Sequence, residues 1–372
     1  MVAVSAAYPT NAYTAAYGQT AKSATTAANT TSSGGTTSAS GSTGSAATEI
    51  TLSSEAQAAL AAKDFATVLA ETKSKLTALL IEAGRTSPLQ NDKLAVDLSS
   101  LDQRELFAMA SDDSFSSDEQ AAAGLEMQRR FEAAMAGPAA VAKVTGDYTG
   151  LYKAAAAYLD SLGDEEKKGT DWIAGREAVT DGLKQLQSDP KTMPEAGDHD
   201  PVALYLALAN AGQTQQQDIK DVAAGARASL DALYAKAIKD GKAPTFNKNT
   251  VVGTYIDLSS FPSRTLSAIA LNTDNKFAPE EASAAQAALR AKSGAALLAG
   301  FQNAAKSSDP TAFSQNIISI FSSMSAEERQ AAGWSDKFYQ AAVQSYQSTS
   351  KLTQMFAEAG GNATGFMSGM GK

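Results

Sequence analysis

The sequence has no cysteine and a single histidine, His199. Disulfide frameworks, thiolate metal sites, cysteine nucleophiles and Ser-His-Asp triads therefore lack their parts or depend on that one histidine. The short motifs of dinucleotide-binding proteins, P-loop proteins, serine hydrolases and zinc peptidases are also missing. These absences favour a protein without catalytic activity or cofactor, and an enzyme of unrecognised class is the third interpretation.

Long apolar runs and basic clusters are absent as well. No stretch approaches the roughly 18 apolar residues of a membrane helix, and no positive charge precedes an apolar segment near residue 1, so we expect neither a membrane span nor a Sec-type signal peptide. The net charge is −9 without a basic run, which disfavours nucleic acid as a partner. A cytoplasmic location and export without a Sec signal both remain open.

Alanine dominates what is present. Hydrophobic residues make up 44% of the chain but aromatic residues only 7%, and alanine is the strongest helix former, so we expect an all-α fold. Residues 1–50 are rich in Ser, Thr, Ala and Gly without periodicity and are predicted to form a disordered tail. Residues 359–372 are glycine-rich and predicted to be a flexible tail. Between the tails we expect two helical units, 51–195 and 196–358.

An internal repeat predicts the two units. Trp172 and Trp334 lie 334 − 172 = 162 residues apart, and the same shift aligns rare residues without a gap from Asp112 to Trp172. The aligned pairs are Asp112/Asp274, Phe115/Phe277, Glu119/Glu281, Asp147/Asp309, Thr149/Thr311, Ser161/Ser323, Glu165/Glu327 and Glu166/Glu328. Upstream, at a shift of 160, Asp-Leu-Ser-Ser recurs, followed by the pair Arg104/Arg264. We therefore predict a tandem duplication with both tryptophans in equivalent environments.

Helix starts recur at matching places in the two units. Ser116 precedes Glu119 by three residues and Ser325 precedes Glu328 by three, which is the capping-box pattern. Where the first unit has the helix start at Ser116, the second unit has Pro279 at the first helical position. Where the second unit has Ser325, the first unit has Gly163. We predict a helix after each of these four positions.

Each unit is also predicted to begin with a longer amphipathic helix. The stripes are Phe65, Val68, Leu69, Thr72, Leu76, Leu79 and Ala83 in the first unit, and Ala223, Ala226, Leu230, Leu233 and Ala237 in the second. Two roles stay open for them: they hold the units together, or each faces the core of its own unit. Residues 94–98 and 251–258 are β-prone and predict at most one short strand per unit.

Two loops resemble the second half of an EF-hand loop. Each has a phenylalanine four places before a glutamate and an aspartate further upstream. The weak candidate calcium ligands are Asp112 and Glu119 in the first unit and Asp274 and Glu281 in the second. The first ligand position of the family would be Ala108 or Ala270, and its glycine is replaced by Asp113 or Asn275. A degenerate calcium-responsive module is therefore the second interpretation, against a turn with a helix cap and a core phenylalanine.

Two further patterns bear on function. The adjacent glutamates 165–166 and 327–328 point about 100° apart on a helix, which favours helix-start acids over a catalytic pair. Residues 47–57, ATEITLSSEAQ, resemble a Ser/Glu/Ala-rich segment of bacterial flagellum-associated and uncharacterised exported proteins. The first interpretation is thus a non-catalytic bacterial helical protein that has a structural or interaction role with a protein partner or with itself, at a secretion, surface or motility apparatus.

Overall fold

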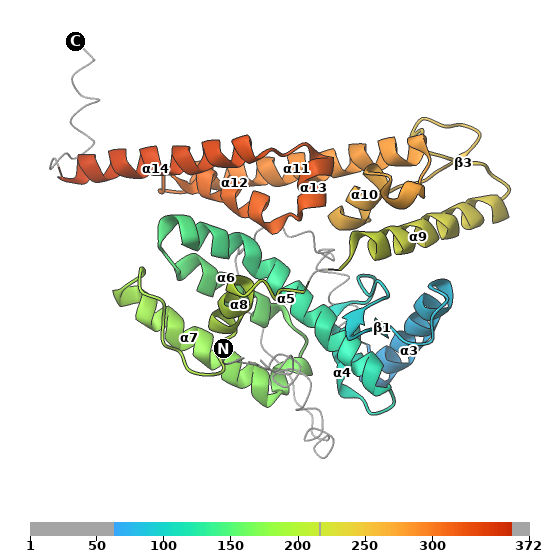
Figure 1. Cartoon of the computed structure of the whole chain (residues 1–372), viewed down its shortest axis with the longest axis horizontal. Coiled ribbons are helices and arrows are strands. Elements are labelled where there is room, and N and C mark those ends of the chain that lie inside the picture. Colours follow the sequence, from blue (N-terminus) through green and yellow to red (C-terminus); the bar gives the residue numbers. More distant parts are fainter. Residues whose placement is uncertain (1–62, 216, 359–372) are drawn as a thin grey trace, which may run out of the picture.

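The computed structural model describes residues 63–215 and 217–358, and these form twelve α-helices and four two-residue strands (Figure 1). The predicted all-α fold is confirmed. The predicted tails, 1–50 and 359–372, lie outside the described residues. None of the described helices has the length and hydropathy needed to cross a membrane.

The two halves of the chain present a similar order of elements. The first half comprises α3 (Phe65–Glu82), β1 (Leu89–Gln90), β2 (Lys93–Leu94), α4 (Gln103–Ser111), α5 (Ser117–Thr145), α6 (Thr149–Ser161), the 3₁₀ turn η2 (Glu166–Lys168), α7 (Thr170–Ser188) and α8 (Pro201–Asn210). The second comprises α9 (Ile219–Lys239), β3 (Pro244–Thr245), β4 (Thr254–Tyr255), α10 (Ser263–Ala270), the 3₁₀ turn η3 (Thr273–Asn275), α11 (Pro279–Lys306), α12 (Ala312–Ser323), α13 (Ala326–Ala332) and α14 (Asp336–Glu358). Among these elements α8 and η3 have no counterpart in the other half, and the common origin of the halves stays a prediction.

Each half has a pair of short strands where one was expected. β1 pairs with β2 in antiparallel fashion, and β3 pairs with β4 in parallel fashion. A lone strand would leave its backbone groups unpaired, so a second segment of the same loop supplies the hydrogen bonds.

Three of the four predicted helix starts are found. The Ser116 and Glu119 backbone and side-chain groups bond reciprocally, and Ser325 and Glu328 do the same. The Ala278 N–H donates to the Glu281 carboxylate at 2.7 Å before α11. The prediction at Gly163 was wrong: only the 3₁₀ turn η2 follows, because glycine has no hydroxyl to accept the N–H at the third helical position.

The long amphipathic helices face the cores of their own halves. Leu76 of α3 belongs to a buried cluster with Leu106 and Phe115 of the first half. Leu230 of α9 belongs to a cluster with Leu266 and Phe277 of the second half. The stripes therefore stabilise each half separately.

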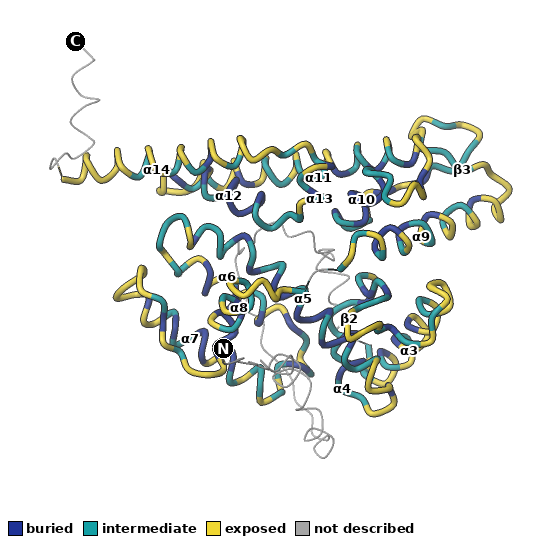
Figure 2. The backbone as a smooth tube through the Cα atoms, viewed as in Figure 1, coloured by how far each residue is buried: buried dark blue, intermediate teal, exposed yellow. Residues whose placement is uncertain are grey.

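Helix α8 belongs to the core of the first half. Val202 and Tyr205 are buried in one cluster with Leu151 and Tyr152 of α6, and α8 packs against α5, α6 and α7 (Figure 2). The expected boundary between residues 195 and 196 is therefore too early, since the first core extends to α8. The exposed junction residue His199 lies just before this helix.

The halves are joined chiefly by α5 and α12. Ile317 and Ile318 of α12 lie in a cluster with Val141 and Val144 of α5. At the same contact, a Cβ added to Gly137 would meet the Ser319 Oγ at 2.4 Å, so the helices pack closely. The residues of α11 at the 162-residue shift from Val141 and Val144 are Asn303 and Lys306, so this apolar contact surface occurs on α5 and not on α11.

Candidate functional site

The EF-hand-like residues of the first half form a turn and a helix cap. The Asp112 carboxylate accepts a hydrogen bond from the Ser114 N–H at 2.9 Å, and the Glu119 carboxylate accepts one from the Ser116 N–H at 2.7 Å. Phe115 is buried in the core of the first half. The turn, the helix cap and the core of the first half therefore account for Asp112, Glu119 and Phe115 respectively.

The second half uses the equivalent residues differently. Asp274 is exposed and lies 3.9 Å from the Lys220 ammonium group. Glu281 is buried and accepts hydrogen bonds from Arg227 at 2.7 Å and Tyr234 at 2.6 Å. Burial opposes the charge of Glu281, but the hydrogen bonds from Tyr234 and Arg227 outweigh it and lower its pKa. Within 63–215 and 217–358, no three acidic or histidine side chains gather in a way that could hold a metal ion.

A repeated arginine clamp explains one glutamate of each adjacent pair. Arg104 donates to Glu165 at 3.0 Å and to the Lys63 carbonyl at 2.9 Å. Arg264 lies 3.5 Å from Glu327 and donates to the Gln217 carbonyl at 2.6 Å. Each clamp ties the segment before the first helix of its half to the segment after the fourth. Sequence reasoning assigned these glutamates to helix starts and missed the clamp, although the arginine and glutamate pairs both recur in the repeat.

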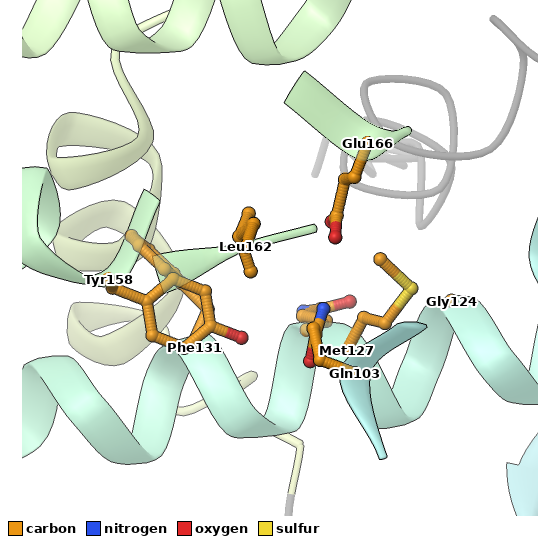
Figure 3. A pocket seen from close by; sticks show the side chains of 8 residues that line it. Gln103, Gly124, Met127, Phe131, Tyr158, Leu162 and Glu166 are labelled. Atoms are coloured by element: carbon orange, nitrogen blue, oxygen red, sulfur yellow. The ribbon is translucent and has the colours of Figure 1, made fainter. Parts of the chain in front are cut away.

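Glu166 is the unusual acid of the structure (Figure 3). It is 4% exposed, and neither carboxylate oxygen has a hydrogen-bond partner among residues 63–215 and 217–358. Burial raises its pKa to about 8. The nearby Gln103 amide and Lys167 partly oppose this shift, although the amide does not have hydrogen-bonding geometry toward the carboxylate. The carboxyl group lines a cavity of about 10 Å³ with Gln103, Gly124, Met127, Gln128, Phe131, Tyr158 and Leu162.

That cavity limits what Glu166 can do chemically. About 10 Å³ is room for one water molecule and not for an organic substrate. A carboxyl group with a pKa near 8 holds its proton at neutral pH, so the site can bind and release a proton. At the equivalent position in the second half, the Glu328 carboxylate instead accepts from the Ser325 N–H at 2.7 Å.

Glu126 of α5 is a buried acid with two arginine partners. Glu126 lies 2.6 Å from Arg129 and 2.9 Å from Arg130. Burial disfavours the charge of Arg129, but Glu126, with smaller contributions from Asp97 and from Glu328 of the second half, raises its pKa. Glu126, Arg129 and Arg130 thus form an ion-pair cluster within α5.

An exposed apolar stripe lies on the distal part of α14, which extends beyond α12 (Figures 1 and 2). Leu352, Met355 and Phe356 are 53%, 55% and 67% exposed. Their spacing of three and four residues places them on one face of the helix. We call these three residues the α14 stripe.

A second exposed apolar group lies on the neighbouring hairpin. Leu298 and Phe301 of α11 and Phe313 of α12 are exposed, and the rings of Phe301 and Phe313 meet edge to face at 5.7 Å. Phe313 is 38% exposed, whereas Leu151, its equivalent in the first half, is 0% exposed in the cluster that includes α8. For the α14 stripe, the sequence signal is the apolar spacing of Leu352, Met355 and Phe356.

Comparison of the chain with protein-family models, with curated proteins and with solved structures gives no match. The fold places the chain in the class of all-helical proteins.

Proposed function

We propose that the protein is a non-catalytic helical protein that acts through protein–protein contacts and associates with a second copy of itself. The observation that carries the proposal is the α14 stripe, three large apolar side chains more than half exposed on a helix that extends from the body (Figure 2). Burying such side chains against another helix contributes roughly 1.5 to 3 kcal/mol each when burial is complete.

The charges near the stripe favour a second copy as the occupant. The whole chain carries a net charge of −9, yet the distal part of α14 has one positive and one negative residue, Lys351 and Glu358. In an antiparallel pair of α14 helices that cross between residues 354 and 355, Lys351 of one copy faces Glu358 of the other. These opposite charges favour the approach of two acidic chains at this surface.

The proposed setting is bacterial, at a secretion, surface or motility apparatus, and it is supported by the resemblance of residues 47–57. A non-catalytic role is supported by the roles found for the acids: caps, ion pairs and one carboxyl group beside a water-sized cavity. Protein rather than nucleic acid as the partner is supported by the negative net charge.

Sedimentation velocity over a range of protein concentrations tests this function. We expect the full chain to form a concentration-dependent dimer and the variant Leu352→Glu, Phe356→Glu to remain monomeric, because each dimer would bury four added charges. Ile173→Glu is the matched control, since Ile173 is 51% exposed on α7 and lies outside the stripe. A full chain that stays monomeric at every concentration, or a control that is equally impaired, would overturn the proposal.

A further inference from the structure

A loop with an apolar tip lies at one end of the second half. The loop connects β3 to β4 over residues 246–253 and follows closely on the last turn of α9. Figure 1 shows β3 and this end of α9 at one end of the second half, with the free end of α14 at the other. A contact made by the loop is therefore separate from the α14 stripe and from the proposed self-association.

The tip of the loop presents two adjacent valines to solvent. Val251 and Val252 are 97% and 87% exposed, more than any other large apolar side chain in the described part of the chain. The stem of the same loop is packed: Phe246 lies against the buried cluster of the second half, and its ring meets the ring of Tyr234 at 6.4 Å. The loop thus has one apolar anchor that packs inward and an apolar tip that does not.

Hydrogen bonds hold the loop in a defined shape. At its base, the Thr254 N–H donates to the Ala243 carbonyl at 2.8 Å. Near its tip, the Gly253 N–H donates to the Thr250 hydroxyl oxygen at 2.9 Å. A loop that is already ordered loses little conformational entropy when its tip binds, so this loop is suited to a contact.

Positive charge gathers around the loop in a chain that is otherwise acidic. Residues 236–255, the basic region, contain four lysines and one aspartate, a net charge of 4 − 1 = +3, so the rest of the chain carries −9 − 3 = −12. The next acid in the sequence, Asp257, accepts a hydrogen bond from the Ser259 N–H at 2.9 Å. The lysines are all exposed and, within 63–215 and 217–358, form no ion pair; they are Lys236, Lys239, Lys242 and Lys248. They are thus available to an anionic partner.

The first half has a strand pair in the same place without these features. Its segment from the end of α3 to the end of β2, residues 82–94, contains two positive and two negative residues. The turn between β1 and β2 is Asn91-Asp92, which has no apolar side chain. A strand pair at this place in the fold therefore requires neither valines nor lysines in its connection.

An anionic membrane surface fits both the charge and the apolar tip. Lipid head groups attract lysines, and the apolar boundary beneath them accepts protruding side chains without a shaped pocket. A nucleic acid offers negative charge but no apolar layer for the valines. We propose that the basic region docks the protein on an anionic lipid surface, with Val251 and Val252 inserted at the head-group boundary. The contact is peripheral, since only the loop enters the membrane surface.

Co-sedimentation of the full chain with lipid vesicles tests the docking. We expect binding to vesicles of equal parts phosphatidylglycerol and phosphatidylcholine, little binding to pure phosphatidylcholine, and weaker binding as salt screens the lysines. Lys242→Gln, Lys248→Gln should weaken binding about twentyfold, at roughly fivefold per lysine near an anionic surface. The matched control is Lys153→Gln, Lys191→Gln, which removes two exposed lysines of the first half. No binding to the anionic vesicles, or an equal loss in the control, would overturn the proposal.

The valines distinguish a lipid surface from other anions. Val251→Ser, Val252→Ser keeps every charge and should weaken binding to the anionic vesicles about tenfold, because apolar surface no longer leaves water. If this variant binds the vesicles as tightly as the original chain, the lysines attract anions in general and the proposed insertion is refuted.

A fluorescent label reports the insertion directly. The chain has no cysteine, so Val251→Cys accepts a single polarity-sensitive dye. We expect its emission to move to shorter wavelength on the anionic vesicles, and no such shift for the control Gln90→Cys, an exposed residue of β1. Equal shifts at the two positions, or none at 251, would contradict the insertion.

Sedimentation velocity without lipid separates this surface from the α14 stripe. Val251→Ser, Val252→Ser should associate like the original chain, because the loop and the stripe lie at opposite ends of the second half (Figure 1). Loss of association in this variant would show that the loop contacts a second copy, which overturns the lipid docking. Vesicle binding by a chain that stays monomeric would refute the self-association and support the docking.

Discussion

The buried carboxyl group of Glu166 makes the pH dependence of stability a sharp test of the structure. Replacing it with glutamine, Glu166→Gln, keeps the shape of the side chain and removes its titration. Glu328→Gln is the matched control, because Glu328 is the equivalent residue and its carboxylate is hydrogen-bonded in a capping box. Both variants carry the same chemical change at equivalent positions of the two halves.

The magnitude follows from the shift in the pKa of Glu166, from 4.5 in an exposed glutamate to about 8 in the folded chain. The folded state keeps the proton between these values while the unfolded state releases it, so the free energy of unfolding falls as pH rises from 4.5 to 8. At 1.36 kcal/mol per pKa unit, the loss between pH 5 and pH 8 is roughly 3 to 4 kcal/mol. Glu166→Gln does not have this loss.

Urea unfolding at pH 5, 6, 7 and 8 measures the effect. The free energy of unfolding of Glu166→Gln relative to the original chain should rise by roughly 3 to 4 kcal/mol across this range. The Glu328→Gln control measures what the same substitution does at a carboxylate that is hydrogen-bonded in a capping box. A difference that is flat with pH would mean that the carboxyl group is hydrated or hydrogen-bonded in the folded protein. The raised pKa of the buried Glu166 carboxyl group would then be refuted.

Two further predictions concern equivalent positions and close packing. Trp172 and Trp334 are both half-buried: the Trp172 indole N–H donates to the Leu159 carbonyl of α6 at 2.9 Å, and the Trp334 ring lies 6.3 Å from the ring of Phe321, the α12 residue aligned with Leu159. Either Trp→Ala change should therefore reduce the free energy of unfolding by a similar amount, roughly 2 to 3 kcal/mol in urea unfolding. A loss at one site only would contradict their equivalence. Gly137→Ala should lower the melting temperature in calorimetry because the new methyl group meets Ser319 of α12, whereas Gly294→Ala, with nothing within 4 Å, should raise it through helix propensity. Equal effects of the two alanines would contradict the close contact of α5 and α12.

The sequence by itself determined the helical class and where several helices begin. Alanine-rich composition favours helices at every position, and a capping box acts between residues three apart, as Ser116 and Glu119 show. The burial of Phe115 and Phe277 also followed from local pattern, because each stands between a turn and a helix start. Such interactions depend on near neighbours in the chain, so one sequence is enough to predict them.

Only the tertiary structure decided which surfaces meet. An amphipathic stripe shows that a helix has a buried face but does not show which helix packs against it. Periodicity therefore could not predict that α3 and α9 face the cores of their own halves. It also could not predict that α8 joins the first core or that α5 packs against α12. Glu166 and Glu328 are aligned in the repeat, yet one carboxyl group lines a cavity without a hydrogen-bond partner among the described residues and the other caps a helix. The first half has Gly163 where the second half has the capping residue Ser325. The Glu166 cavity is lined by side chains as far away in the sequence as Gln103, 166 − 103 = 63 residues earlier, and only the folded chain brings them together.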